Sequence, residues 1–236
     1  MRRSRRYTAL SEQYERSKEY RLAEAVELVR KHATARFDES VDIAVKLGID
    51  PKKQDQMVRG TVGLPHGTGK TVRVLVFCKG EKEEEAKAAG AEFVGFEDLV
   101  EKVKGGWNDF DVAVATPDTM SAVGRLGKIL APKGKMPSPK TKTVTFDVAD
   151  AVKALKAGRI NYRTDKTGNV HALVGKVSFE PVSLLENARA FVAELIRVKP
   201  ASAKGQYIRT AALSSTMGPG VRIDVRDLTE TARKGD

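Results

Sequence analysis

Residues 72–78 read Val72-Arg73-Val74-Leu75-Val76-Phe77-Cys78, a nearly continuous apolar run that is rich in β-branched side chains. Such a run is typical of a strand buried on both faces, as in a parallel sheet covered by helices. Strand-like and helix-like patterns then alternate, which predicts a Rossmann-like β/α domain. The expected helices are 81–89, 97–104 and 120–130, and the expected strands are 72–78, 92–94 and 110–115.

The sequence on either side of this region has a different pattern. Val41, Ile43, Val45 and Leu47 alternate with other residues, which predicts a half-buried strand at 40–47. Other expected elements are helices at 20–34 and 181–198, and strands at 58–62, 160–163, 170–177, 206–213 and 221–225.

These patterns predict an α+β domain built from both chain ends, with an inserted three-layer α/β Rossmann-like domain. The first would comprise residues 1–67 plus 159–228, and the inserted domain would comprise residues 68–158. Residues from Asp227 onward are expected to fray, with 229–236 as a flexible tail. Gly67, Gly69 and Gly158 stand at the two crossings and are the predicted hinge for motion of one domain against the other.

The chain of 236 residues has 42 basic and 31 acidic side chains, a formal net charge of +11. Residues 1–67 carry +4 and residues 159–236 carry +5, whereas residues 68–158 carry only +2. A patch that attracts a polyanion is therefore expected where the two ends meet, although a basic surface without a partner remains an alternative. Arg2, Arg3, Arg5 and Arg6 resemble a nucleic-acid-binding arm.

No apolar run approaches the length that a membrane span requires, and the N-terminus lacks the apolar segment of a signal peptide. We therefore expect a cytoplasmic protein with no membrane partner.

Known catalytic and cofactor motifs match poorly. Residues 63–71 resemble a phosphate-binding loop, but Leu64 stands where glycine is needed and a strand follows instead of a helix. No G-x-G-x-x-G motif follows the strand at 72–78, and the three histidines lack a second ligand at metal-binding spacing. Cys78 is the only cysteine. We expect no catalytic site, no metal and no cofactor.

Three stretches could contact RNA. Residues 214–220, Ser-Ser-Thr-Met-Gly-Pro-Gly, combine hydroxyls, a methionine and two glycines between predicted strands. The glycines permit positive φ or close approach of another molecule, which suits ribose hydroxyls and phosphates, although an ordinary hairpin is the alternative. Residues 125–142 form a basic, proline-containing loop that is either a phosphate contact or simply solvated. Phe37 either caps the core or packs on a ribose or base.

Several motifs together resemble one known family, the bacterial ribosomal proteins numbered one in the large subunit, which lie at its mobile stalk. The resemblance extends from about Tyr7 to Val225. It rests on Phe37-Asp38-Glu39-Ser40, Asp50-Pro51, Arg59-Gly60-Thr61-Val62, Leu64-Pro65-His66-Gly67, Ala115-Thr116-Pro117-Asp118, Asp165-Lys166-Thr167-Gly168 and Thr216-Met217-Gly218-Pro219.

This resemblance implies a structural protein of the large ribosomal subunit that is a monomer when free. It implies three RNA partners: the 23S rRNA stalk, the exit-site tRNA whose release it assists, and the mRNA of its own operon, whose translation it represses. The implied RNA-binding residues are Arg36, Phe37, Ser40, Asp165, Lys166, His171, Ser214, Thr216, Met217 and Gly218.

We expect these residues to form one rigid surface, with Lys133, Lys135 and Lys140 as a secondary basic loop. Asp165 would order its turn or accept a hydrogen bond from a base or ribose. Two alternatives remain: a nonspecific nucleic-acid-binding protein and a nucleotide-binding β/α enzyme.

Overall fold

The computed structural model describes residues 4–80 and 82–233. It is a mixed α/β structure with several sheets, and its internal packing divides the chain into two compact units. The first unit contains the residues up to Gly69 and those from Ile160 onward, and the second contains residues 70–159.

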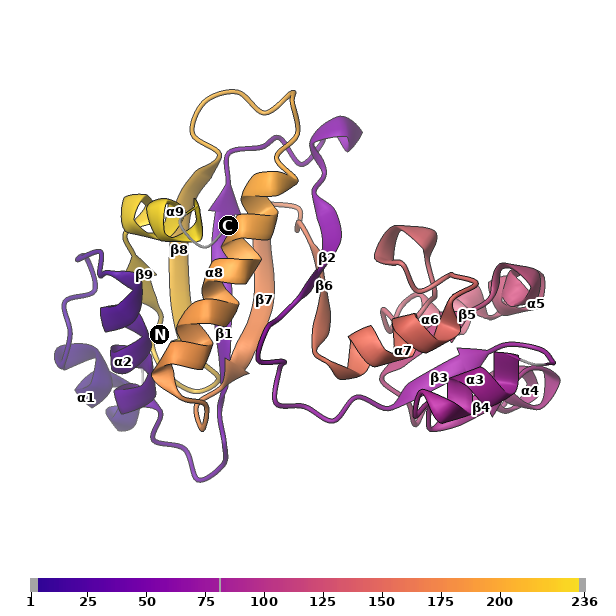
Figure 1. The fold of residues 1–236 in the computed structure, drawn as a ribbon. Helices are drawn as coiled ribbons and strands as arrows, with labels where there is room; N and C mark the ends of the chain where they lie inside the picture. The colour runs from indigo at the N-terminus through magenta and orange to yellow at the C-terminus, as the bar shows by residue number, and fades with distance from the viewer. Residues whose placement is uncertain (1–3, 81, 234–236) are drawn as a thin grey trace. The chain divides into compact units, whose positions relative to one another are not determined.

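The centre of the first unit is a four-stranded antiparallel sheet with strand order β7-β1-β8-β9 (Figure 1). The central strand β1 therefore pairs with two strands that come from the other end of the sequence. The strands are β1 (Ser40–Leu47), β7 (Asn169–Lys176), β8 (Ile208–Ser215) and β9 (Val221–Ile223).

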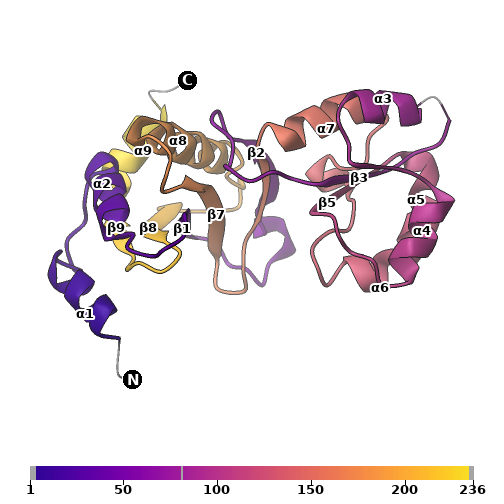
Figure 2. The same ribbon diagram turned by 90° about the horizontal axis from the view of Figure 1, so that it is seen from below.

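Helices cover one face of this sheet (Figure 2). In α8 (Pro181–Arg197), apolar residues recur three and four positions apart and are buried, among them Leu184, Ala188 and Phe191. They pack against the buried alternate residues of the strands in one hydrophobic core, which α2 (Leu22–His32) and α9 (Val225–Arg233) complete. This packing leaves the other face of the sheet to solvent.

Two segments at the chain ends differ from the sequence-based expectation. Residues 227–233, expected to fray, belong to the helix α9, because Leu228 and Ala232 are one turn apart and both are buried. Residues 234–236 lie outside the described residues, as do Arg2 and Arg3. Arg5 and Arg6 of the basic arm begin a helix, α1 (Arg5–Glu12), and the side chain of the capping residue Ser4 accepts a hydrogen bond from Tyr7 N.

A two-stranded sheet of β2 (Arg59–Gly63) and β6 (Arg159–Arg163) lies near the two crossings. The proposed hinge residues Gly67, Gly69 and Gly158 have φ values of 67°, 70° and 96°, a region that favours glycine. Asn187 Nδ2 donates to Gly67 O, and a Cβ on Gly69 would come within 2.9 Å of Lys176 and Phe179. Both glycines are thus packed against other residues of the first unit, to which they belong. Hinge motion stays a prediction.

The second unit contains a three-stranded parallel sheet with order β4-β3-β5 and hydrophobic clusters on both faces. The expected helix at 120–130 is interrupted by a 3₁₀ turn, Gly124–Leu126, which is bounded by glycines. The elements are β3 (Val74–Phe77), α3 (Lys82–Ala88), β4 (Phe93–Gly95), α4 (Glu97–Lys104), β5 (Val112–Ala115), α5 (Met120–Val123), α6 (Gly127–Leu130) and α7 (Val148–Lys156).

Short 3₁₀ turns complete the structure at Gln54–Gln56, Pro117–Thr119 and Pro139–Thr141. No helix in the described part of the chain is both long and apolar enough to cross a membrane.

Candidate nucleic-acid interface

The open face of the four-stranded sheet carries the outward-pointing residues of all four strands. In β1, Val41, Ile43, Val45 and Leu47 face the helices and are buried, so the alternate residues face outward. The register places His171 beside Ala44 and Ser214 beside Asp42 on this outward face. Two of the predicted site residues therefore share one face, although they are distant in sequence.

At one end of this face, two loops expose large apolar side chains. Phe37, in the loop before β1, is 55% exposed, and Met217, in the loop after β8, is 48% exposed. Arg36 and Thr216, their neighbours in sequence, are also exposed. Exposed apolar side chains at a polar surface suit stacking on bases or packing on riboses.

The buried carboxylate of Glu39 connects these two loops. One oxygen accepts a hydrogen bond from Ala35 N at 2.9 Å, and the other accepts one from Met217 N at 2.9 Å. Burial alone would raise the pKa of Glu39, but the hydrogen bonds from Met217 and Ala35 and the charge of Arg6 outweigh it, and the pKa is lowered. Glu39 is therefore charged, and the charge is satisfied by the backbone of both loops.

Thr216 joins the same loops directly. Its hydroxyl oxygen accepts a hydrogen bond from Ser40 N at 2.9 Å, and its backbone N–H donates to Ser40 O at 3.0 Å. The hydroxyl of Thr216 is therefore held against the backbone of Ser40, at the residue where β1 begins.

Gly218 is needed for space. A Cβ at this position would lie 2.4 Å from the hydroxyl oxygen of the buried Ser215. Neither Gly218 nor Gly220 has a positive φ, so of the two expected uses of these glycines, positive φ does not apply and close approach remains. At Gly218, the close approach is made by the side-chain hydroxyl of Ser215, within the protein itself.

Asp38 fixes the loop before β1 from the other side. Its carboxylate accepts hydrogen bonds from the backbone N–H and the hydroxyl of Ser178, and its carbonyl accepts one from Lys176 Nζ. The loop that presents Phe37 is thus tied both to β7 and, through Glu39, to the loop after β8.

Asp165 and Lys166 lie at the opposite end of the sheet. Leu47, the last residue of β1, donates to Gly168 O in the turn that contains them. The two ends of this eight-residue strand are about 23 Å apart at the usual rise per residue. The expected residues therefore form two clusters on this face: Ser40 and Ser214 lie near one end, and His171, whose Nε2 is 3.9 Å from a carboxylate oxygen of Asp165, belongs with the other.

The carboxylate of Asp165 orders its own turn. It accepts hydrogen bonds from Asn169 N and Thr167 N, each at 2.8 Å, and from both side chains. The bond from Asn169 N, with those from Thr167, lowers the pKa of Asp165 well below its ordinary value. Of the two expected roles for Asp165, the structure supports the ordering of the turn.

Several residues of this face were not predicted. Lys46, Thr210 and Arg222 are exposed on the outward face, and Arg6 and Glu39 hold the Met217 loop. The alternation of β1 already places Lys46 with Asp42, so this signal was available in the sequence. Arg6 was expected only as part of a basic arm. The contacts of Arg6 and Glu39 with the loop gave no signal, because their partners are 211 and 178 residues away.

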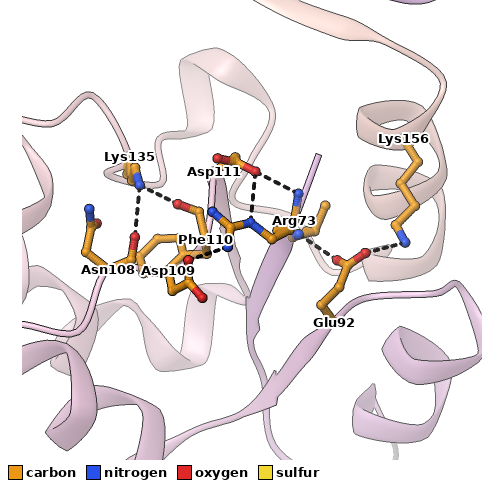
Figure 3. Close-up of polar contacts among 9 residues, drawn as sticks. Arg73, Glu92, Asn108, Asp109, Phe110, Asp111, Lys135 and Lys156 are labelled. Carbon is orange, nitrogen blue, oxygen red and sulfur yellow. Dashed lines mark hydrogen bonds and ion pairs between the residues drawn. The ribbon is translucent and has the colours of Figure 1, made fainter. Parts of the chain in front are cut away.

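The predicted secondary basic loop is only partly available to a ligand (Figure 3). Lys135 Nζ donates to the carbonyl oxygens of Asn108 and Phe110 and lies 4.9 Å from the centre of the Phe110 ring. Its ammonium group therefore binds the chain before β5, a role that neither of the two alternatives for this loop included. Lys133 and Lys140 are exposed.

The same picture shows the ion pairs and hydrogen bonds at the N-terminal ends of the three parallel strands (Figure 3). Arg73 pairs with Asp109 and Asp111, and Glu92 pairs with Lys156 at 2.8 Å and accepts from Val74 N (Figure 3). These contacts join the chain segments that precede β3, β4 and β5.

The described residues offer little for catalysis. No three of their His, Cys, Asp and Glu side chains lie close enough together to hold a metal ion. Burial raises the pKa of the Cys78 thiol to about 11, so it stays protonated at neutral pH. No helix begins in the described stretch between Gly63 and Val74, which a phosphate-binding loop would require.

Comparison with known proteins identifies the family of the chain. Residues 29–219 match the family described as "Ribosomal protein L1p/L10e family". A relative from Thermobifida fusca (strain YX), named "Large ribosomal subunit protein uL1", is 54% identical over 233 residues, which cover 99% of this chain and 99% of the relative. The chain therefore belongs to the ribosomal protein L1p/L10e family.

Proposed function

We propose that the open face of the first unit binds structured RNA, and that its principal ligand is the stalk of 23S rRNA in the large subunit of cytoplasmic ribosomes. Membership of the family makes the chain a structural ribosomal protein, not an enzyme. The observation that carries the proposal is the joining of the Phe37 and Met217 loops by Glu39, which presents two exposed apolar side chains beside hydroxyls.

The two clusters suit a folded RNA more than a linear polyanion. One end of the face offers an aromatic ring, a methionine and hydroxyls, and Lys46, Thr210 and Arg222 lie on the strands between the ends. Hydroxyls and apolar side chains can contact riboses and unpaired bases, while the cations supply the salt-sensitive attraction to phosphates. Arg36, Phe37, Ser40, Ser214, Thr216, Met217 and Gly218 would form one contact, and Asp165, Lys166 and His171 a second.

The proposal extends to two further RNAs. The protein would assist release of deacylated tRNA from the exit site, and it would repress translation of its own operon through an mRNA site that imitates the rRNA site. Both roles follow from the resemblance, and the second requires the same face to accept either RNA but not both at once.

The test is a binding titration of Met217→Asp against a fragment of stalk RNA. We expect a loss of at least a hundredfold in affinity, because a carboxylate would then face phosphates and would replace an apolar contact. The matched control is Val182→Asp, since Val182 is 58% exposed and lies on α8, which covers the opposite face. Equal affinities for the two variants would remove this face from the site.

A second arm tests whether charge alone explains binding. The wild-type protein is titrated with stalk RNA and with duplex DNA of the same length at two salt concentrations. A nonspecific binder would have similar affinity for both at matched salt. We expect RNA to bind more tightly, with a ratio that increases with salt.

A further inference from the structure

The N-terminal helix α1 contacts the Met217 loop, although no sequence motif connects them. Arg6 Nη2 donates a hydrogen bond to Met217 O at 2.9 Å, and the Tyr14 hydroxyl, just beyond the helix, donates to Gly220 O at 3.1 Å. The two accepting carbonyls flank Gly218 and Pro219. The N-terminal segment thus holds the backbone of the loop on both sides of its centre.

These contacts complete those made by the loop before β1. Glu39 accepts the hydrogen bond from Met217 N, and Arg6 donates to the carbonyl of the same residue. Both polar groups of the Met217 backbone are therefore bound to charged side chains, while its side chain remains exposed. A hydrogen bond with a charged partner is stronger than one between neutral groups. The two bonds therefore restrain the backbone of Met217 more than neutral partners would.

The helix itself is anchored to the first unit. Leu10 of α1 is buried, and the Tyr14 ring packs against the buried His32 ring with centroids 5.3 Å apart. His32 O also lies 3.8 Å from where a Cβ of Gly218 would be, so the anchor and the loop are adjacent.

We propose that α1 and the residues that follow it, 5–14, are a positioning segment, in which Arg6 and Tyr14 hold residues 216–220 in their RNA-binding conformation before RNA arrives. The proposal rests on the RNA-binding function proposed above. Its physical basis is preorganisation: a loop that is already ordered loses less conformational entropy when it binds. The competing role for Arg6 is a direct contact with an RNA phosphate.

The first experiment needs no RNA. Amide hydrogen exchange of Met217 and Gly218 is measured in the free full-length protein and in Arg6→Ala, with Arg5→Ala as control. Arg5 is an exposed neighbour of the same charge in the same helix. We expect exchange at these amides to be roughly tenfold faster in Arg6→Ala, the effect of losing one hydrogen bond to a charged group. Unchanged exchange, or equal acceleration in Arg5→Ala, would overturn the proposal.

The second experiment separates positioning from phosphate contact. Affinity for the stalk RNA fragment is measured across salt concentrations for the same variants and for Tyr14→Phe. We expect Arg6→Ala to lose roughly tenfold in affinity with the slope of log affinity against log salt unchanged, whereas loss of a phosphate contact lowers that slope by about one. A lowered slope, or an equal loss in Arg5→Ala, would contradict positioning.

Tyr14→Phe removes a donor without changing charge, so we expect it to weaken binding in the same way but less. If the wild-type protein does not bind the RNA, the proposed function fails, and the exchange experiment still decides whether α1 orders the loop.

Discussion

At the scale of single residues, Glu39 shows how a buried charge can specify a surface. A carboxylate is costly to bury unless its oxygens accept hydrogen bonds, and here each oxygen has a backbone N–H from a different loop. Displacing either loop would leave one of the two carboxylate oxygens without its backbone donor. The geometry of the Phe37 and Met217 loops is thus coupled through one side chain.

We expect Glu39→Gln to destabilise the first unit by about 1–3 kcal/mol, because the amide NH₂ would replace an acceptor opposite a backbone donor. Urea unfolding at neutral pH measures the loss, and Glu27→Gln, on the exposed face of α2, is the control.

The effect of this substitution should depend on pH. The pKa of Glu39 is lowered in the folded protein, so its contribution is complete above the pKa of an unfolded glutamate and disappears as pH falls through the lowered value. The gap in stability between wild type and Glu39→Gln should therefore narrow in acid. A gap that is constant with pH would contradict the assigned role of the charge.

At the scale of elements, the sequence predicts those whose pattern is strong. β1 begins and ends at the predicted residues because its alternation of apolar and other residues is regular. The helix α4 also begins and ends at its predicted residues. The helix α9 was missed because only Leu228 and Ala232 are buried in it, and its stability depends on packing against other elements.

Prediction of the candidate site is limited in the same way, because the sequence pattern does not show tertiary contacts. The Ser214–Gly220 loop was recognisable from its composition, whereas its contacts with Arg6 and Glu39 depend on tertiary folding across most of the chain. Lys135 lies in a basic stretch whose composition suggests phosphate contacts, but its ammonium group donates hydrogen bonds to two backbone carbonyls. Composition identifies candidates, and packing decides which of them face solvent.

If α9 is part of the folded core, Leu228→Ala should cost about 2–5 kcal/mol, the usual range for a buried leucine. Glu230→Ala, on the exposed side of the same helix, should change stability by less than about 0.5 kcal/mol. Thermal unfolding followed by circular dichroism compares them. A negligible effect of Leu228→Ala would support the frayed tail expected from the sequence.

At the scale of the whole molecule, each unit has its own hydrophobic core. One cluster contains only residues of the first unit, and the other two contain only residues of the second. Charge is divided in the same way, since the excess of basic residues lies in the chain ends that form the first unit. Under the proposed function, most of the charge that attracts RNA lies in the first unit, and the separate cores predict that the second unit can unfold by itself.

The chain contains spectroscopic probes for testing this separation. Its only tryptophan, Trp107, packs against Phe93 and Phe110 in the second unit, whereas the tyrosines lie in the first. We expect Leu155→Ala, in a core of the second unit away from Trp107, to lower the Trp107 fluorescence midpoint in urea through a loss of about 2–5 kcal/mol. The tyrosine signal and RNA binding should not change, because no buried cluster of described residues includes both Leu155 and the first unit. Equal shifts of the tryptophan and tyrosine transitions would show instead that the two cores unfold as one cooperative unit.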